Sequence, residues 1–132
     1  MQIPIFKPQT EWTAPTDFPD LSKYDEIAID LETKDPNLNE RMGSGSVIGV
    51  GDVVGISLAT HDWCAYYPIA HEGGGNLDRK MVLKWLQDQM NTNSTKIFHN
   101  AMYDVCWLRR LGIKINGKIV DTMIAAAIIN EN

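Results

Sequence analysis

Two acidic residues near the start of the chain have the type and spacing to bind metal ions. The segment DEIAIDLETKDP, residues 25–36, places Asp30 and Glu32 two positions apart, with isoleucine and leucine alternating between the acids. This alternation predicts a half-buried β-strand that carries both carboxylates on one face. Ionised carboxylates beside a core are unfavourable without a compensating charge. Carboxylate oxygens suit Mg²⁺ or Mn²⁺, and ions about 3.5 to 4 Å apart are a recurring device for phosphodiester hydrolysis.

A second polar pair follows about seventy residues later. In FHNAMYDVCWL, Asn100 and Asp104 are four positions apart at the start of an expected helix, so both side chains can point the same way. A structural explanation also stays open at this point. A carboxylate in the first turn of a helix is favoured by the helix dipole, and Asn100 could be only a helix cap.

The elements that must position these groups alternate in type along the chain. VVGISLAT (53–60) and WCAYYPIA (63–70) predict an antiparallel hairpin, and Asn76 is a plausible N-cap for a helix over 77–90. Four further elements follow: a strand over TKIFH, a helix that ends at Gly112, a short strand over KIV, and a final apolar helix over DTMIAAAIIN. The order β-β-β-α-β-α-β-α predicts an α/β fold: a ribonuclease H-like mixed sheet of about five strands flanked by helices.

Two segments outside these elements have a distinctive composition. Residues 1–23 are rich in proline and contain the spaced aromatics Phe6, Trp12 and Phe18, which predicts an extended arm lying on a domain that spans 24–132. The polar, glycine-bearing segment 34–52 predicts a loop of unusual length that could flank a site.

Charge and cysteine content exclude several classes of protein. The 12 basic and 17 acidic residues give a net charge of −5, which argues against nucleic-acid binding by charge alone, although divalent cations could reverse the local sign. Cys64 and Cys106 form no CxxC pattern, so neither a zinc site nor a disulfide scaffold is indicated. No apolar stretch is long enough to suggest a membrane span or a signal peptide, and a cytoplasmic protein fits best.

Three segments together are similar to a known family. IAIDLET, KIFHNAMYDVCWLRRLGI and IVDTMIAAAIIN resemble the proofreading 3′-to-5′ exonuclease domain of family A DNA polymerases, the polymerase I type, and look closest to its phage branch. That domain belongs to the DEDD exonucleases, whose first motif is D-x-E and whose second is N-x-x-x-D. The resemblance runs from about residue 24 to residue 130. It implies that the protein is located in the cytoplasm of a phage-infected or bacterial host cell.

The resemblance implies a role for each acidic residue. Asp30 matches the carboxylate that bridges two metal ions, Mg²⁺ or Mn²⁺. Glu32 matches the one that binds the tighter ion and orients the attacking water, and Asp104 the one that holds the second ion. Asp121 occupies a position typical of the family, where we expect a structural role, capping the last helix.

The resemblance also implies a substrate and a partner. Asn100, Tyr103 and the backbone around Thr33 match positions near the terminal nucleotides. The expected reaction is hydrolysis of the 3′-terminal phosphodiester of single-stranded or frayed DNA ends, which releases nucleoside monophosphates. A downstream polymerase domain of the same protein is the expected partner.

One part of the family pattern is missing. The third motif, Y-x-x-x-D or H-x-x-x-D, does not occur before residue 132, so we expect the domain to be truncated before that motif, with a C-terminally incomplete fold and impaired activity. Two alternatives stay open. One is a non-catalytic module that binds nucleic acid or scaffolds an assembly, and the other is an RNA-trimming nuclease of the ribonuclease D type.

Overall fold

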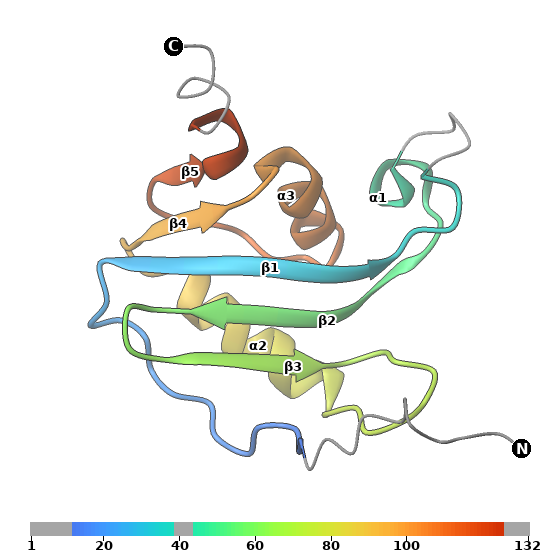
Figure 1. The fold of residues 1–132 in the computed structure, drawn as a ribbon, viewed down its shortest axis with the longest axis horizontal. Helices are drawn as coiled ribbons and strands as arrows, with labels where there is room; N and C mark the ends of the chain where they lie inside the picture. The colour runs from blue at the N-terminus through green and yellow to red at the C-terminus, as the bar shows by residue number, and fades with distance from the viewer. Residues whose placement is uncertain (1–11, 39–43, 126–132) are drawn as a thin grey trace, which may run out of the picture.

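A computed structural model describes residues 12–38 and 44–125 as one five-stranded sheet with three helices and the first residues of a further helix (Figure 1). The strand order is β3-β2-β1-β4-β5. The elements are β1 (Glu26–Lys34), α1 (Gly45–Ile48), β2 (Asp52–Ala59), β3 (Cys64–Pro68), α2 (Arg79–Met90), β4 (Thr95–Phe98), α3 (Ala101–Arg110) and β5 (Ile119–Asp121).

The sheet is mixed, as the order of elements predicts. β1 pairs antiparallel with β2, and β2 pairs antiparallel with β3. β4 and β5 extend the other edge in parallel, each after a helical connection. The expected α/β fold and the hairpin are therefore confirmed. The loop expected over 34–52 contains the one-turn helix α1, and its residues 39–43 lie outside the described part.

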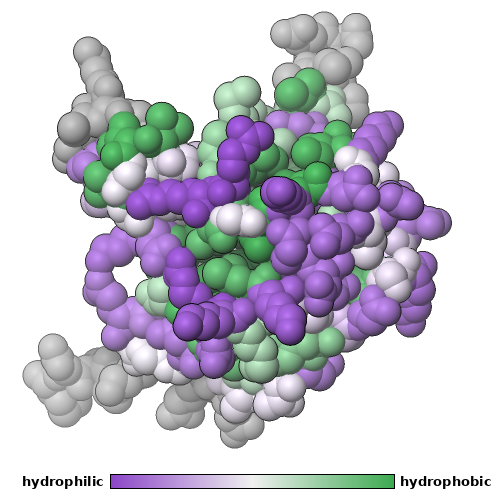
Figure 2. Space-filling view, turned by 180° about the vertical axis from the view of Figure 1, so that it is seen from behind, coloured by the Kyte–Doolittle hydropathy of each residue, from purple (hydrophilic) through white to green (hydrophobic). Residues whose placement is uncertain are grey.

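Apolar residues on one face of the sheet form the core. Alternate residues of β1, among them Ile27 and Ile29, are buried and belong to one cluster with α2 and α3. In Figure 1, α2 lies behind β2 and β3, whereas no helix of the described residues covers the near face. Seen from the helix side, hydrophobic residues gather at the centre of the surface and hydrophilic residues surround them (Figure 2).

Helix α2 packs against this core through the stripe of apolar side chains that its sequence predicts. Its buried residues include the four expected ones, Val82, Trp85, Leu86 and Met90. The expected N-cap is wrong, because Asp78 caps the helix by accepting a hydrogen bond from the Met81 amide at 3.1 Å. Asn76 instead bonds the backbone of His71 and closes the loop before the helix.

The described part of the N-terminal arm, residues 12–23, has no helix or strand and packs on the domain. Phe18 stacks on Tyr67 with a centroid separation of 5.4 Å, and Leu21 is only 1% exposed. The indole of Trp85 donates to the Pro19 carbonyl at 2.8 Å. The division of the chain at residue 23 stays a prediction.

The last expected helix begins directly after β5. Residues 122–125 are helical, and residues 126–132 lie outside the described part. Among the described helices, none has the length and apolar character needed to cross a membrane.

Candidate active site

β1 presents the two expected carboxylates on the face of the sheet opposite α2. Asp30 and Glu32 are both exposed, while Ile29 and Leu31 on either side of Asp30 are buried. Asp30 pairs with Ser57 and Glu32 with Gly55, after which the register shifts because β2 contains an extra residue, Val54. A bulge of this kind bends its strand and often re-aims neighbouring side chains.

Helix α3 brings Asp104 to the same strand. β1 and β4 pair only as far as Ala28 and Ile97, and α3 starts four residues after that point. The hydroxyl of Tyr103 lies 2.8 Å from that of Thr33, so α3 lies beside the half of β1 that β4 does not pair.

The start of α3 is fixed by a residue from β5. Asn100 has a left-handed backbone conformation, with φ at 65°, and its side chain makes no capping hydrogen bond. The Asp121 carboxylate instead accepts from the amides of Asn100 at 3.0 Å and Ala101 at 2.9 Å. It also accepts from the Met123 amide at 3.0 Å, which confirms the expected cap of the last helix. The Ala101 amide is the main cause of the lowered pKa of Asp121.

The Asp104 carboxyl group is buried without full compensation. Its residue is 3% exposed, and its Oδ2 atom has no hydrogen-bond partner in the described structure. Burial first, and then the negative charge of Asp30, raise the pKa of Asp104 from 3.8 to about 7. A backbone hydrogen bond from Leu31 acts in the opposite direction. The chain therefore brings Asp30 and Asp104 together, and a cation beside them would stabilise both charges.

Glu32 is held by other partners. Its Oε2 atom accepts a hydrogen bond from the Tyr66 hydroxyl at 2.6 Å and lies 3.8 Å from Nε2 of His71. Within residues 12–38 and 44–125, no three His, Cys, Asp or Glu side chains form a group that could hold one metal ion. The side chains are thus divided into the pair Asp30–Asp104 and the hydrogen-bonded group of Glu32, Tyr66 and His71.

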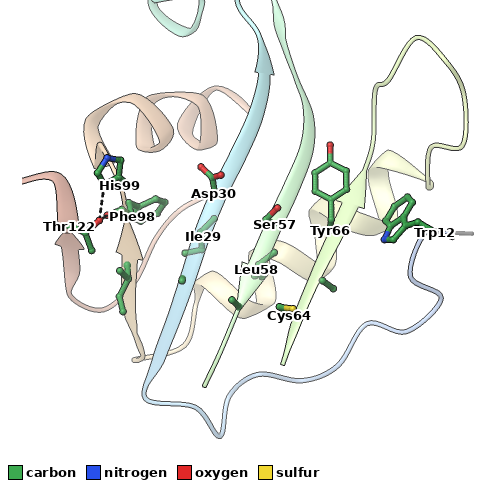
Figure 3. Close-up of a pocket in the computed structure, with 14 residues that line it drawn as sticks. Trp12, Ile29, Asp30, Ser57, Leu58, Cys64, Tyr66, Phe98, His99 and Thr122 are labelled. Atoms are coloured by element: carbon green, nitrogen blue, oxygen red, sulfur yellow. Dashed lines mark hydrogen bonds between the residues drawn. The ribbon is translucent and has the colours of Figure 1, made fainter. Parts of the chain in front are cut away.

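A hollow of about 740 Å³ lies beside Asp30 on the same face of the sheet (Figure 3). Ser57 and Tyr66 line it from β2 and β3, and His99 and Thr122 line it from the parallel edge, where their side chains are 3.0 Å apart. Cys64 also lines the hollow. Both cysteines are free.

The expected substrate-binding residues lie near Asp104. Asn100 is exposed at the start of α3. The Tyr103 hydroxyl already bonds within the protein, to Thr33 and, at 3.0 Å, to Asp35, which also accepts from the Gly45 amide at 2.9 Å. Tyr103 therefore connects α3 to the end of β1 and to α1.

Tyr66 and His71 are neighbours of the acidic site that the sequence did not predict. The strand pattern places Tyr66 on the same face as Asp30, which is a usable signal. Contact with Glu32 also depends on Gly55, whose missing side chain leaves room for the tyrosine ring. His71 lies in a turn, and nothing in the local pattern indicates that it folds back onto Tyr66.

Comparisons with known proteins agree with the resemblance. A family model described as 3′-5′ exonuclease matches residues 10–132. A DNA-directed DNA polymerase of Pseudomonas phage M6 is 35% identical over 120 residues, which are 86% of this chain and 18% of that protein. DNA polymerase I of Chloroflexus aurantiacus is 37% identical over 82 residues, 61% of this chain and 9% of that protein. This chain thus spans less than a fifth of the length of either relative.

Solved structures agree on the fold. The EXO domain of Aedes aegypti Nibbler superposes with a TM-score of 0.57 at 16% identity, covering 83% of this chain and 49% of that one. Brucella melitensis NrnC superposes with a TM-score of 0.54 at 20% identity, covering 85% of this chain and 48% of that one. A further structure of NrnC contains bound Mg²⁺.

The match of the family model covers nearly the whole chain, and the curated relatives are phage and bacterial DNA polymerases. The chain therefore belongs to the 3′-5′ exonuclease family, as an exonuclease domain of the kind found in DNA polymerases.

Proposed function

We propose that Asp30, Glu32 and Asp104 hold divalent cations in this chain and hydrolyse the 3′-terminal phosphodiester of DNA. The observation that carries this proposal is the buried Asp104 carboxyl group, whose unpartnered Oδ2 atom lies in a region that already contains the charge of Asp30. A buried carboxyl group close to a second negative charge is unfavourable unless a proton or a cation neutralises it.

The donor set fits the metals that the family uses. Exonucleases of this family depend on divalent cations. Asp30 and Asp104 supply hard carboxylate oxygens, which favour Mg²⁺ or Mn²⁺ over softer metals. Glu32, two positions from Asp30 on the same face of β1, supplies a third carboxylate. We propose that these three carboxylates would hold two ions.

The chain's own groups have distinct tasks in this proposal. Divalent cations, when bound, lower the pKa of a water molecule and stabilise the charge that develops on the departing 3′ oxygen. Asp30 and Asp104 provide the negative charge that holds the cations, and Glu32 orients the attacking water. The backbone near Thr33 and the side chain of Asn100 contact the terminal nucleotide. Nothing in this set reads base edges, so we expect low sequence specificity.

DNA is the proposed substrate, because the curated relatives are named as DNA polymerases. Such a domain would act on single-stranded or frayed 3′ ends. A polymerase domain in the same protein, which would supply those ends, is the proposed partner.

The test is degradation of a 5′-labelled single-stranded oligonucleotide by the full chain with Mg²⁺ or Mn²⁺. We expect stepwise release of nucleoside monophosphates from the 3′ end, reduced about 100-fold or more by Asp30→Asn and Asp104→Asn, because metal-assisted charge stabilisation is a large contribution to catalysis. Asp88→Asn, on the exposed side of α2, is the matched control. Cleavage that survives both site variants would contradict the proposal.

The same assay separates the alternatives. Binding of the oligonucleotide without cleavage at any metal concentration would support a non-catalytic module. Preferred trimming of an RNA oligonucleotide of the same sequence would support an RNA-processing nuclease.

A further inference from the structure

Tyr66 reaches the acidic site by crossing a neighbouring strand. It lies on β3, opposite Ser57 of β2, and its ring points to the open face of the sheet, as does Asp30 from β1 (Figure 3). Glu32 lies on β1, which is separated from β3 by β2, and it pairs with Gly55 of β2. The phenol group must therefore pass over Gly55 to meet Glu32.

Gly55 is the residue that leaves room for this crossing. A Cβ atom at this position would lie 1.8 Å from the Tyr66 hydroxyl oxygen and 2.2 Å from its Cζ atom. Both separations are far shorter than any real van der Waals contact, so a side chain at position 55 would displace the ring. A glycine inside a strand usually weakens it, and a close approach by another group is a common reason for its presence.

The Tyr66 hydroxyl sits between two partners. It donates its proton to Oε2 of Glu32 at 2.6 Å, and its oxygen lies 2.5 Å from Nε2 of His71. Because a phenol has a single proton, Nε2 of His71 must carry the proton of the second hydrogen bond.

His71 is itself held in place by the loop that follows it. Its amide donates to Oδ1 of Asn76, and Nδ2 of Asn76 donates to its carbonyl, both at 2.8 Å. Hydrogen bonds thus connect Asn76 to His71, His71 to Tyr66, and Tyr66 to Oε2 of Glu32. The other oxygen of Glu32 has no hydrogen bond from the described residues.

We propose that Tyr66, seated over Gly55 and supported by His71, is a positioning residue that fixes Oε2 of Glu32 and leaves Oε1 for a divalent cation. This inference rests on the proposed function, because it takes Glu32 as a metal-binding carboxylate. Carboxylates that bind metals are usually oriented by hydrogen bonds from residues behind them, and loss of such a residue lowers metal affinity about 10-fold to 100-fold.

The test is calorimetric titration of the full chain with Mn²⁺, without substrate. We expect Tyr66→Phe, which removes a single oxygen atom, to weaken Mn²⁺ binding about 10-fold. Tyr24→Phe is the matched control, because Tyr24 donates a hydrogen bond of the same 2.6 Å length to Asp62, a carboxylate outside the acidic site. Gly55→Ala should weaken binding in the same direction as Tyr66→Phe.

A double-mutant cycle shows whether Tyr66 acts through Glu32. In a Glu32→Gln background, Tyr66→Phe should change Mn²⁺ affinity by less than about 2-fold, because the group that it positions no longer binds as a carboxylate. An equal loss in both backgrounds would indicate a general structural role and overturn the inference.

The outcomes also separate this inference from the proposed function. Mn²⁺ binding that is lost in Asp104→Asn but unchanged in Tyr66→Phe would overturn the positioning role alone. A wild-type chain that binds no Mn²⁺ would overturn both proposals.

Discussion

Asp121, at the end of β5, caps helix α3 by accepting a hydrogen bond from the amide of Ala101 at 2.9 Å. The first turn of α3 also carries Asp104, so the same contact sets where the buried carboxyl group lies. A residue distant in sequence therefore holds the acidic site together from the parallel edge of the sheet.

Replacing Asp121 should loosen this helix start. Asp121→Ala leaves the amides of Asn100, Ala101 and Met123 without their acceptor, and loss of a helix cap lowers the free energy of unfolding. Urea unfolding followed by circular dichroism measures the change in the free energy of unfolding. Asp88→Ala, an exposed change on α2, should stay within about 0.5 kcal/mol of wild type. Equal stability of the two variants would show that the cap contributes nothing.

Tyr103 should control the mobility of α1. Tyr103→Phe removes the hydroxyl that bonds Thr33 and Asp35, and Asp35 is the residue that accepts from the Gly45 amide. We expect a loss of about 1 kcal/mol and faster hydrogen exchange at the amides of residues 45–49. Hydrogen exchange followed by NMR measures this, with amides of α2 as the internal reference. Unchanged exchange at Gly45 would contradict the role given to Tyr103.

The stability of the metal-free chain should depend on pH through Asp104. Its pKa is about 7 in the folded protein and 3.8 ordinarily, so the folded state binds this proton more strongly than the unfolded chain does. The resulting stabilisation is complete below pH 3.8 and is lost as the pH rises through about 7. Asp104→Asn should remove this dependence. Thermal unfolding in a chelator from pH 4 to 8 tests it, and a constant difference between wild type and variant would contradict it.

The fold could be predicted because its signals are local. The alternation in β1, the apolar stripe of α2 and the glycine after α3 each specify an element within a few residues. The order of elements then leaves few ways to pair the strands. The start of α2 was misplaced at Asn76 because both Asn76 and Asp78 can cap a helix, and only the turn at His71 decides between them.

The acidic residues could be named from the sequence, but their surroundings could not. Spacing on a strand places Asp30 and Glu32 on one face, and helical spacing places Asp104 in the first turn of α3. The raised pKa of Asp104 depends on burial and on the charge of Asp30, and the contact of Tyr66 with Glu32 depends on pairing across three strands. Such long-range contacts leave no periodic pattern in the sequence.

The most direct test of the central claim is to locate Mn²⁺ by anomalous diffraction from crystals of the full chain grown with the metal. The account predicts a Mn²⁺ ion about 2.1 Å from carboxylate oxygens of both Asp30 and Asp104. Crystals in which the two carboxylates bind no ion at millimolar Mn²⁺, or in which the ion lies away from them, would contradict it.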